Sequence, residues 1–265
     1  MNKWVKESER LAKGDSYLDR LMEIYPPDEL TRGIIASGDI KRLKEIYERK
    51  KCKELIAELI RLMKQEFRFP LDHPYIGFLS HYPDAIDKNP KIVSQICNRL
   101  LNLEFREIIE KLESPKSASR RMGPMFRNWL KNNFKFVDYN VFETCNEMVF
   151  LTGGDRTLKD YATEKLKCKF HKLTKGLDFL IKFRDRFIIG TAKFITRLGG
   201  SQTNQFNEAI RLIKETACPS NILKIAIIDG VAWIDNRMRQ SLETFKKGEF
   251  ALSALLLKKF LNEVF

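Results

Sequence analysis

The stretch GLDFLIKFRDRFIIGTAKF, residues 176–194, contains a carboxylate and an ammonium group that could act on one substrate. Thr191 and Lys193 lie two residues apart on an expected strand, so their side chains emerge on the same face. The preceding strand is expected to be antiparallel and adjacent, which brings Asp178 next to them. A carboxylate and a lysine at one strand end suit metal-assisted hydrolysis of a phosphodiester. The alternative is an ordinary hairpin that happens to contain both residues.

Each of these two side chains has a defined part in such a hydrolysis. Asp178 would hold Mg²⁺, whose charge lowers the pKa of a bound water and neutralises charge developing on the phosphoryl group. Lys193 would orient or deprotonate the water and contact the scissile phosphate. Because Mg²⁺ is usually held by only one or two protein carboxylates, a hairpin with one acid offers few ligands but can still bind the ion.

The elements around the hairpin indicate how the two residues are positioned. LDFLIKF alternates with a period of two, as a strand does, and the short RDR turn leads into FIIGTAKFI as a second strand. One face of the first strand is expected to carry Phe179, Ile181 and Phe183. The other face is expected to carry Asp178, Leu180 and Lys182. A helix over 201–217 and an almost continuously apolar strand over 221–230 follow, which predicts a right-handed parallel crossover.

The N-terminal half has a different pattern. Residues 39–67 and 89–113 carry apolar side chains at spacings of three and four, which predicts helices. A Ser-, Pro- and Gly-containing basic stretch, SPKSASRRMG, follows at 114–123. We therefore expect a helical region over 1–113, for gripping DNA or for dimerisation, and an α/β core with a mixed sheet over 114–265.

Charge and composition narrow the class of protein. Lys and Arg number 48 against 35 Asp and Glu, which gives a net charge of +13 and favours polyanionic partners, nucleic acid first. No apolar run approaches the roughly 20 residues that span a bilayer, and the N-terminus has no signal-peptide core. We expect a soluble cytoplasmic protein with no membrane contact. Its five cysteines form no C-x-x-C pair and are expected to be reduced thiols.

Asp178, twelve residues, and then TAK, followed by a helix and a buried strand, resembles the core of the PD-(D/E)-x-K nucleases, especially type II restriction endonucleases. The resemblance covers roughly residues 120–235 and rests on KGLDF, IGTAKF, LGGSQ and the helix–strand order. It implies a first acid at Asp178, a second at Thr191 and the lysine at Lys193. Leu177 stands where the family name has Pro. Thr191 is the larger departure, because a neutral hydroxyl is a weaker metal ligand than a carboxylate.

The resemblance also implies where other site residues lie. Members often add a helix glutamate, and Glu143 with Glu147 shares one helical face at the spacing i, i+4. Asp155, which has the sequence context of a helix N-cap, and Glu164 are further options for the compensating acid. Glutamines occur at the start of the crossover helix in the family, which places Gln202 in the catalytic set; the alternative is a helix-start residue that binds no ligand.

Basic and amide side chains near the hairpin are the candidates for DNA contact. Lysines precede Asp178 in EKLKCKFHKLTKG, and arginines lie at the 114–123 boundary and after the second strand. The candidate DNA-binding residues are Arg120, Arg121, Lys169, Lys172, Lys175, Arg197 and Gln205. The competing interpretation of the lysines is a solvated strand edge that they protect from pairing.

The preferred hypothesis is a type II restriction endonuclease that cleaves both strands of a short specific double-stranded DNA site with Mg²⁺. Because such sites are two-fold symmetric, a homodimer is expected. The alternatives are a DNA-binding protein whose nuclease core is degenerate, a structure-selective repair nuclease of the same fold, and a basic α/β protein that does not bind nucleic acid.

Overall fold

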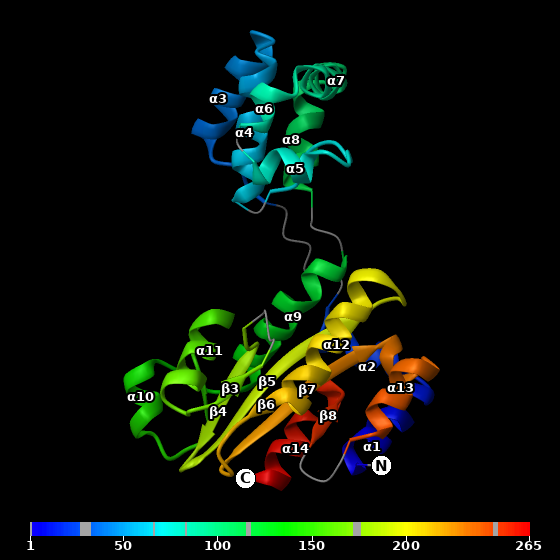
Figure 1. Ribbon diagram of the computed structural model, residues 1–265, viewed down its shortest axis with the longest axis vertical. Helices are drawn as coiled ribbons and strands as arrows, with labels where there is room; N and C mark the ends of the chain where they lie inside the picture. The colour runs from blue at the N-terminus through cyan, green and yellow to red at the C-terminus, as the bar shows by residue number, and fades with distance from the viewer. Residues whose placement is uncertain are drawn as a thin grey trace. The chain divides into compact units, whose positions relative to one another are not determined.

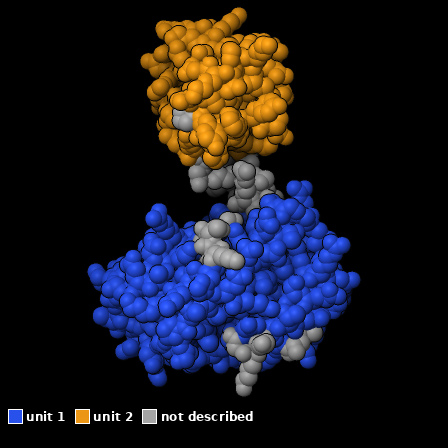
Figure 2. Space-filling model, in the orientation of Figure 1, with its two compact units in different colours: residues 1–27, 118–265 blue, residues 28–117 orange. Residues whose placement is uncertain are grey.

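A computed structural model describes residues 2–26, 33–65, 67–82, 84–114, 118–171, 176–245 and 249–265, and of 118–120 only the backbone. The chain divides into two compact units (Figure 2). Unit 1 comprises Met1–Pro27 and Ala118–Phe265, and unit 2 comprises Asp28–Ser117. None of the helices in the described part of the chain is long and apolar enough to cross a membrane.

Unit 2 is helical and has a buried core of its own. Its helices are α3 (Ser37–Glu48), α4 (Cys52–Lys64), α5 (Ile76–His81), α6 (Ala85–Lys88), α7 (Pro90–Leu101) and α8 (Phe105–Glu113). The core is built by the apolar stripes of these helices, with Leu43, Leu59, Ile96 and Leu100 fully buried. The predicted helical character of this region is therefore confirmed.

Each of the two apolar stretches predicted in unit 2 contains a break. Residues 39–67 form α3 and α4 rather than one helix, because Lys50 adopts a left-handed conformation with φ 50° between them. Residues 89–113 form α7 and α8, and Glu104 begins α8 with a capping box to Glu107. Apolar spacing continues across both breaks, so the pattern alone does not reveal them.

Unit 1 is built on a mixed six-stranded sheet with the order β1-β2-β4-β5-β7-β8 (Figure 1). Its strands are β1 (Phe136–Val137), β2 (Val149–Leu151), β4 (Phe179–Phe183), β5 (Arg186–Ile195), β7 (Ile222–Gly230) and β8 (Phe250–Leu252). β2, β4 and β5 pair antiparallel, whereas β5, β7 and β8 run parallel. The connection from β5 through α12 (Gly200–Glu215) to β7 is the predicted crossover.

Helices cover both faces of this sheet. Those of unit 1 other than α12 are α1 (Lys3–Lys13), α2 (Tyr17–Leu21), α9 (Ala118–Asn133), α10 (Tyr139–Thr144), α11 (Asp155–Glu164), α13 (Asn236–Glu243) and α14 (Leu257–Val264), with short 3₁₀ turns η1 (Val231–Trp233) and η2 (Ala254–Leu256). Phe179 and Ile181 of β4 belong to the core cluster with α1, α9 and α14. Leu180 belongs to the cluster with α10 and α11. The predicted alternation along β4 is therefore confirmed.

The division into units differs from the predicted one at residue 113, because the first residues of the chain pack in unit 1. Trp4, Val5 and Leu21 are buried in the same core cluster as α9 and the sheet. The pattern of α1 and α2 resembles that of the unit 2 helices, so the sequence does not distinguish the two groups. Unit 2 is thus inserted between two parts of unit 1.

A buried carboxylate fastens this N-terminal segment to the end of β7. Asp229 has no exposed surface and accepts hydrogen bonds from Tyr25 Oη at 2.8 Å and Ser253 Oγ at 2.5 Å. Tyr17 Oη lies at 3.4 Å from Asp229 and accepts a bond from the Gly230 amide at 3.1 Å. Burial raises the pKa of the Asp229 carboxyl to about 6, against the opposing effect of these hydrogen bonds.

Two disulfides correct the expectation that the cysteines are reduced. Cys52 pairs with Cys97 inside unit 2, and Cys168 pairs with Cys218 inside unit 1, while Cys145 is free. The second bridge continues the antiparallel pairing of the short strands β3 (Lys169–Phe170) and β6 (Thr216–Ala217) by one register position. The partners are 45 and 50 residues apart, so no local sequence motif identifies them.

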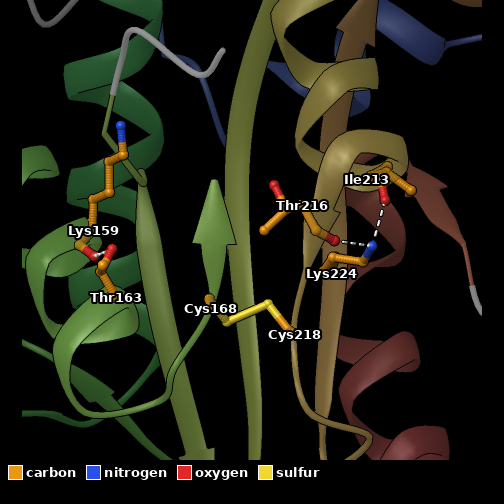
Figure 3. The surroundings of a disulfide bond; sticks show 7 residues. All are labelled: Lys159, Thr163, Cys168, Ile213, Thr216, Cys218 and Lys224. Atoms are coloured by element: carbon orange, nitrogen blue, oxygen red, sulfur yellow. Dashed lines mark hydrogen bonds between the residues drawn. A yellow bond between two sulfur atoms is a disulfide. The ribbon is translucent and has the colours of Figure 1, made fainter. Parts of the chain in front are cut away.

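The Cys168–Cys218 bridge ties the segment that leads toward Asp178 to the end of α12 (Figure 3). Beside it, Lys224 Nζ donates to the carbonyl oxygens of Ile213 and Thr216, both at 2.6 Å. These bonds satisfy acceptors at the C-terminus of the helix. Burial lowers the pKa of the Lys224 ammonium.

Candidate active site

The register of the β4–β5 hairpin brings Asp178 and Thr191 opposite one another. Phe179 pairs with Gly190, so the position before it faces the position after it. Asp178 Oδ2 accepts hydrogen bonds from Thr191 Oγ1 at 2.7 Å and from the Ala192 amide at 2.8 Å. Lys193 Nζ lies 2.9 Å from the same oxygen. The predicted grouping of these three side chains is present in the fold.

Close packing beneath the hairpin holds this register. A Cβ atom at Gly190 would lie 2.0 Å from the ring of Phe179, so no larger residue fits opposite that phenyl group. Phe179 in turn packs against Phe126 of α9, with ring centroids 6.3 Å apart. The face of β5 opposite Lys193 is covered as well, because Tyr25 packs edge-on against Phe194. Asp178, Thr191 and Lys193 therefore share one face of a hairpin whose other face is packed.

The electrostatics of the pair keep the carboxylate charged. The side chains of Asp178 and Lys193 are 20% and 13% exposed. Burial alone would raise the pKa of the Asp178 carboxyl, but the Lys193 ammonium, together with bonds from Ala192 and Thr191, lowers it below its ordinary value. The charged form is the one that binds a metal ion.

One oxygen of Asp178 is available for a ligand. All three hydrogen bonds go to Oδ2, and Oδ1 accepts none from the described residues. Carboxylate oxygen is the ligand that Mg²⁺ prefers, and the ion commonly keeps several waters around one or two such groups. Among the described residues no three His, Cys, Asp or Glu side chains gather as a ready-made metal cage. The donor set fits Mg²⁺ bound mainly through Asp178.

The two glutamates expected to supply a second acid lie elsewhere. Lys182 Nζ donates to the backbone carbonyls of Phe142 and Glu143, and Lys182 is four residues along β4 from Asp178, about 13 Å at the rise of a strand. Glu147 precedes β2, whose first residue pairs with Lys182. It forms an exposed ion pair with Lys135 at 2.7 Å. Contrary to the prediction, neither glutamate lies beside Asp178.

Asp155 lies close to the residues that precede Asp178. It is the first residue of α11 and not the predicted N-cap, which is Gly154. Its carbonyl oxygen accepts a hydrogen bond from the Leu177 amide at 3.0 Å. Its carboxylate forms an ion pair with Arg127 of α9. The sequence did not predict a role for Arg127, since nothing in the pattern of α9 links this residue to Asp155.

The glutamines at the start of α12 differ in their surroundings. Gln202 is buried, and its Oε1 accepts a hydrogen bond from the Thr196 amide at 3.2 Å. It therefore fixes the chain just beyond β5, and among the described residues no hydrogen bond joins it to Asp178. Gln205 is partly buried on the same helix. Neither glutamine contacts Lys193 in the described part of the chain.

The basic candidates are dispersed around unit 1. Lys172 and Lys175, and the side chain of Arg120, lie outside the described residues. Lys169 is exposed on β3, and Arg197 is exposed just after β5 ends. Arg121 of α9 has two buried guanidinium nitrogens, Nε and Nη1, without an acceptor among the described residues. An anion such as a phosphate would satisfy them.

The chain resembles one known family over almost its full length. A model of the family described as Tsp45I type II restriction enzyme matches residues 2–264. Comparisons with curated proteins and with solved structures find no match. The matched span includes both units. The mixed sheet, preceded along the chain by helices, agrees with the restriction-endonuclease-like fold that the sequence predicted.

Proposed function

The chain belongs to the Tsp45I type II restriction enzyme family, and from that premise we propose a Mg²⁺-dependent endonuclease that cuts both strands of a short specific site in double-stranded DNA. The observation that supports this reacting centre is the 2.9 Å contact between Lys193 Nζ and Asp178 Oδ2. The two groups share one face of a hairpin whose other face is packed.

Asp178 would hold the metal ion through Oδ1, since Oδ2 is occupied by its three donors. When bound, Mg²⁺ supplies positive charge that polarises water and the scissile phosphate. Lys193 holds Asp178 in its ionised form and offers its remaining protons to a phosphate oxygen or to the attacking water. Thr191 donates to Asp178 and so fixes the carboxylate instead of adding a second negative charge.

The wider protein would position the DNA around this pair. We assign phosphate contacts to the basic residues of unit 1 and a homodimeric assembly to a two-fold symmetric site. Unit 2, with residues 28–117, is proposed to read or grip the DNA or to contribute to the dimer. Gln202 is proposed to act indirectly, by fixing the end of the catalytic strand.

Cleavage of plasmid DNA with Mg²⁺ tests the proposal. The wild-type chain is expected to give discrete fragments, and Asp178→Ala or Lys193→Ala to slow cleavage by roughly 10²–10⁴-fold. Asp185→Asn is the matched control, because Asp185 is an exposed acid at the opposite end of the same hairpin.

The other outcomes separate the alternatives. Nicking without sequence preference would favour a repair nuclease. Tight, salt-dependent binding without cleavage would favour a degenerate nuclease core. Equal cleavage by the wild-type chain and Asp178→Ala would remove Asp178 from the reaction.

A further inference from the structure

Thr191 leaves the site with one carboxylate on the hairpin, and a second acid lies beside it. We propose that Asp155, at the start of α11, is the second acid for the metal ion and supplies the carboxylate ligand that Thr191 cannot supply. This inference rests on the proposed function and adds a residue to its site.

The first argument is the approach of two backbones. A Cβ atom at Gly176 would lie 2.0 Å from the Asp155 carbonyl oxygen and 2.7 Å from the Asp155 Cβ. Only glycine fits there, and the Leu177 amide donates to that carbonyl at 3.0 Å. The start of α11 is thus pressed against the two residues that precede Asp178.

The second argument is reach. Adding standard bond lengths to that 3.0 Å hydrogen bond puts the Cα atoms of Asp155 and Asp178 within about 11 Å of each other. An aspartate oxygen extends about 3.5 Å from its Cα, and an Mg–O bond adds about 2.1 Å. Two aspartates that reach toward one ion therefore span about 11 Å, so a shared ion is within reach even at the upper limit of the separation.

The third argument is orientation. Leu180 belongs to the same core cluster as Leu158 of α11, so the face of β4 that carries Asp178 is the one that α11 covers. The other acids of α11, Asp160 and Glu164, are five and nine residues from Asp155, about 7.5 Å and 13.5 Å away along the axis. Because the Asp155 carbonyl contacts the Leu177 amide, Asp155 is the acid of that helix nearest to Asp178.

The fourth argument is availability. The Asp155 carboxylate caps no helix, is 50% exposed and, among the described residues, forms an ion pair with Arg127 alone, whose side chain is 40% exposed. Ion pairs this exposed are weak, so Arg127 would reduce the affinity of a competing metal ion by less than about fivefold.

Metal binding by the full chain without DNA tests the role of Asp155 separately from activity. Mn²⁺ is used as the probe, and the free ion is followed by electron paramagnetic resonance. Asp155→Asn is expected to weaken binding by about tenfold or more, since losing even an outer-shell partner costs that much. Asp160→Asn is the matched control, because Asp160 is an exposed acid on the same helix with its own arginine, Arg156.

A second variant tests the part of Arg127. Arg127→Met removes the competing cation and is expected to tighten Mn²⁺ binding by up to about fivefold. Thermal unfolding of each variant confirms that it is folded. Wild-type affinity in Asp155→Asn, or weaker Mn²⁺ binding in Arg127→Met than in the wild type, would overturn the proposal.

The result for Asp178→Ala distinguishes this inference from the proposed function. If Asp178→Ala loses Mn²⁺ binding and DNA cleavage while Asp155→Asn keeps both, only the role of Asp155 is lost. If Asp178→Ala keeps both, the proposed function fails and the role of Asp155 fails with it.

Discussion

Unit 1 and unit 2 each have a buried core and one disulfide, yet they differ in charge. Unit 2 contains 17 Lys and Arg and 15 Asp and Glu of the chain's 48 and 35, which leaves unit 1 with 31 and 20. Unit 1 therefore carries +11 of the net +13, and Asp178 and Lys193 lie in it. The difference favours our proposal that the phosphate contacts are made by unit 1.

If the units are separate cooperative bodies, each disulfide should stabilise only its own unit. Replacing Cys168 and Cys218 by Ala is expected to lower the free energy of unfolding of unit 1 by up to about 4 kcal/mol, because the bridge closes a long loop. Replacing Cys52 and Cys97 should do the same to unit 2. Hydrogen exchange read by mass spectrometry measures both units in one sample.

One result would contradict the description of the two units as separate cooperative bodies. If either pair of substitutions increases exchange throughout the buried helices of both units, they unfold together and must be treated as one body. The free thiol variant Cys145→Ala serves as the control for replacing a cysteine that has no bridge.

A smaller effect is expected from pH, and only in unit 1. The pKa of Asp229 is raised to about 6 in the folded protein, above an unfolded value of about 3.9. The folded state thus binds this proton more tightly. Its stabilising contribution, roughly 2–3 kcal/mol, is complete below about pH 4 and is lost as pH rises through about 6.

Asp229→Asn isolates this contribution because it removes the titrating group and keeps the shape. The free energy of unfolding of the wild type, minus that of the variant, should fall between pH 4 and pH 7 in denaturant titrations. Tyr17 and Tyr25 face Asp229 and stay neutral in that range, since burial raises the pKa of both phenols. A difference that grows with pH would contradict the expected sign. Asp185→Asn, an exposed acid, should show no trend.

The smallest effect concerns single charges. Arg197→Ala in unit 1 is expected to reduce the slope of log binding constant against log salt by about 1, as for one lost phosphate contact. Arg49→Ala, an exposed arginine of unit 2, should leave the slope unchanged. Fluorescence anisotropy with duplex DNA over a range of salt concentrations measures both. Equal losses from the two variants would show that unit 2 also contacts phosphates.

The grouping of Asp178, Thr191 and Lys193 could be predicted because its geometry is local. A period-two strand, a short turn and a second strand fix the register, and the register places Asp178 opposite Thr191. The acid that we propose as the second metal ligand could not be selected in this way. Choosing Asp155 over Glu143 depends on how α11 and β2 meet β4, and those contacts join segments with no shared pattern.

The assignment of the first residues to unit 1 was also beyond the sequence. Tyr25 and Asp229 are 204 positions apart. In the sequence, an aspartate at the end of an apolar strand is as compatible with a surface turn as with a buried carboxylate that accepts several hydrogen bonds. The breaks at Lys50 and before Glu104 were missed for another reason. The spacing of apolar residues continues unchanged from one helix to the next across each break.

The insertion of unit 2 sets an order of events during synthesis of the chain. All buried residues of the unit 2 core lie between Ile35 and Leu112, so that unit can complete its packing early. The segment with Tyr17 and Tyr25 emerges before it but must wait for Asp229 and Ser253, which are added at least 204 positions after Tyr25. A chain truncated before β7 lacks these partners. The packing of the first residues onto the sheet is thereby completed only after β7 and Ser253 have been synthesised.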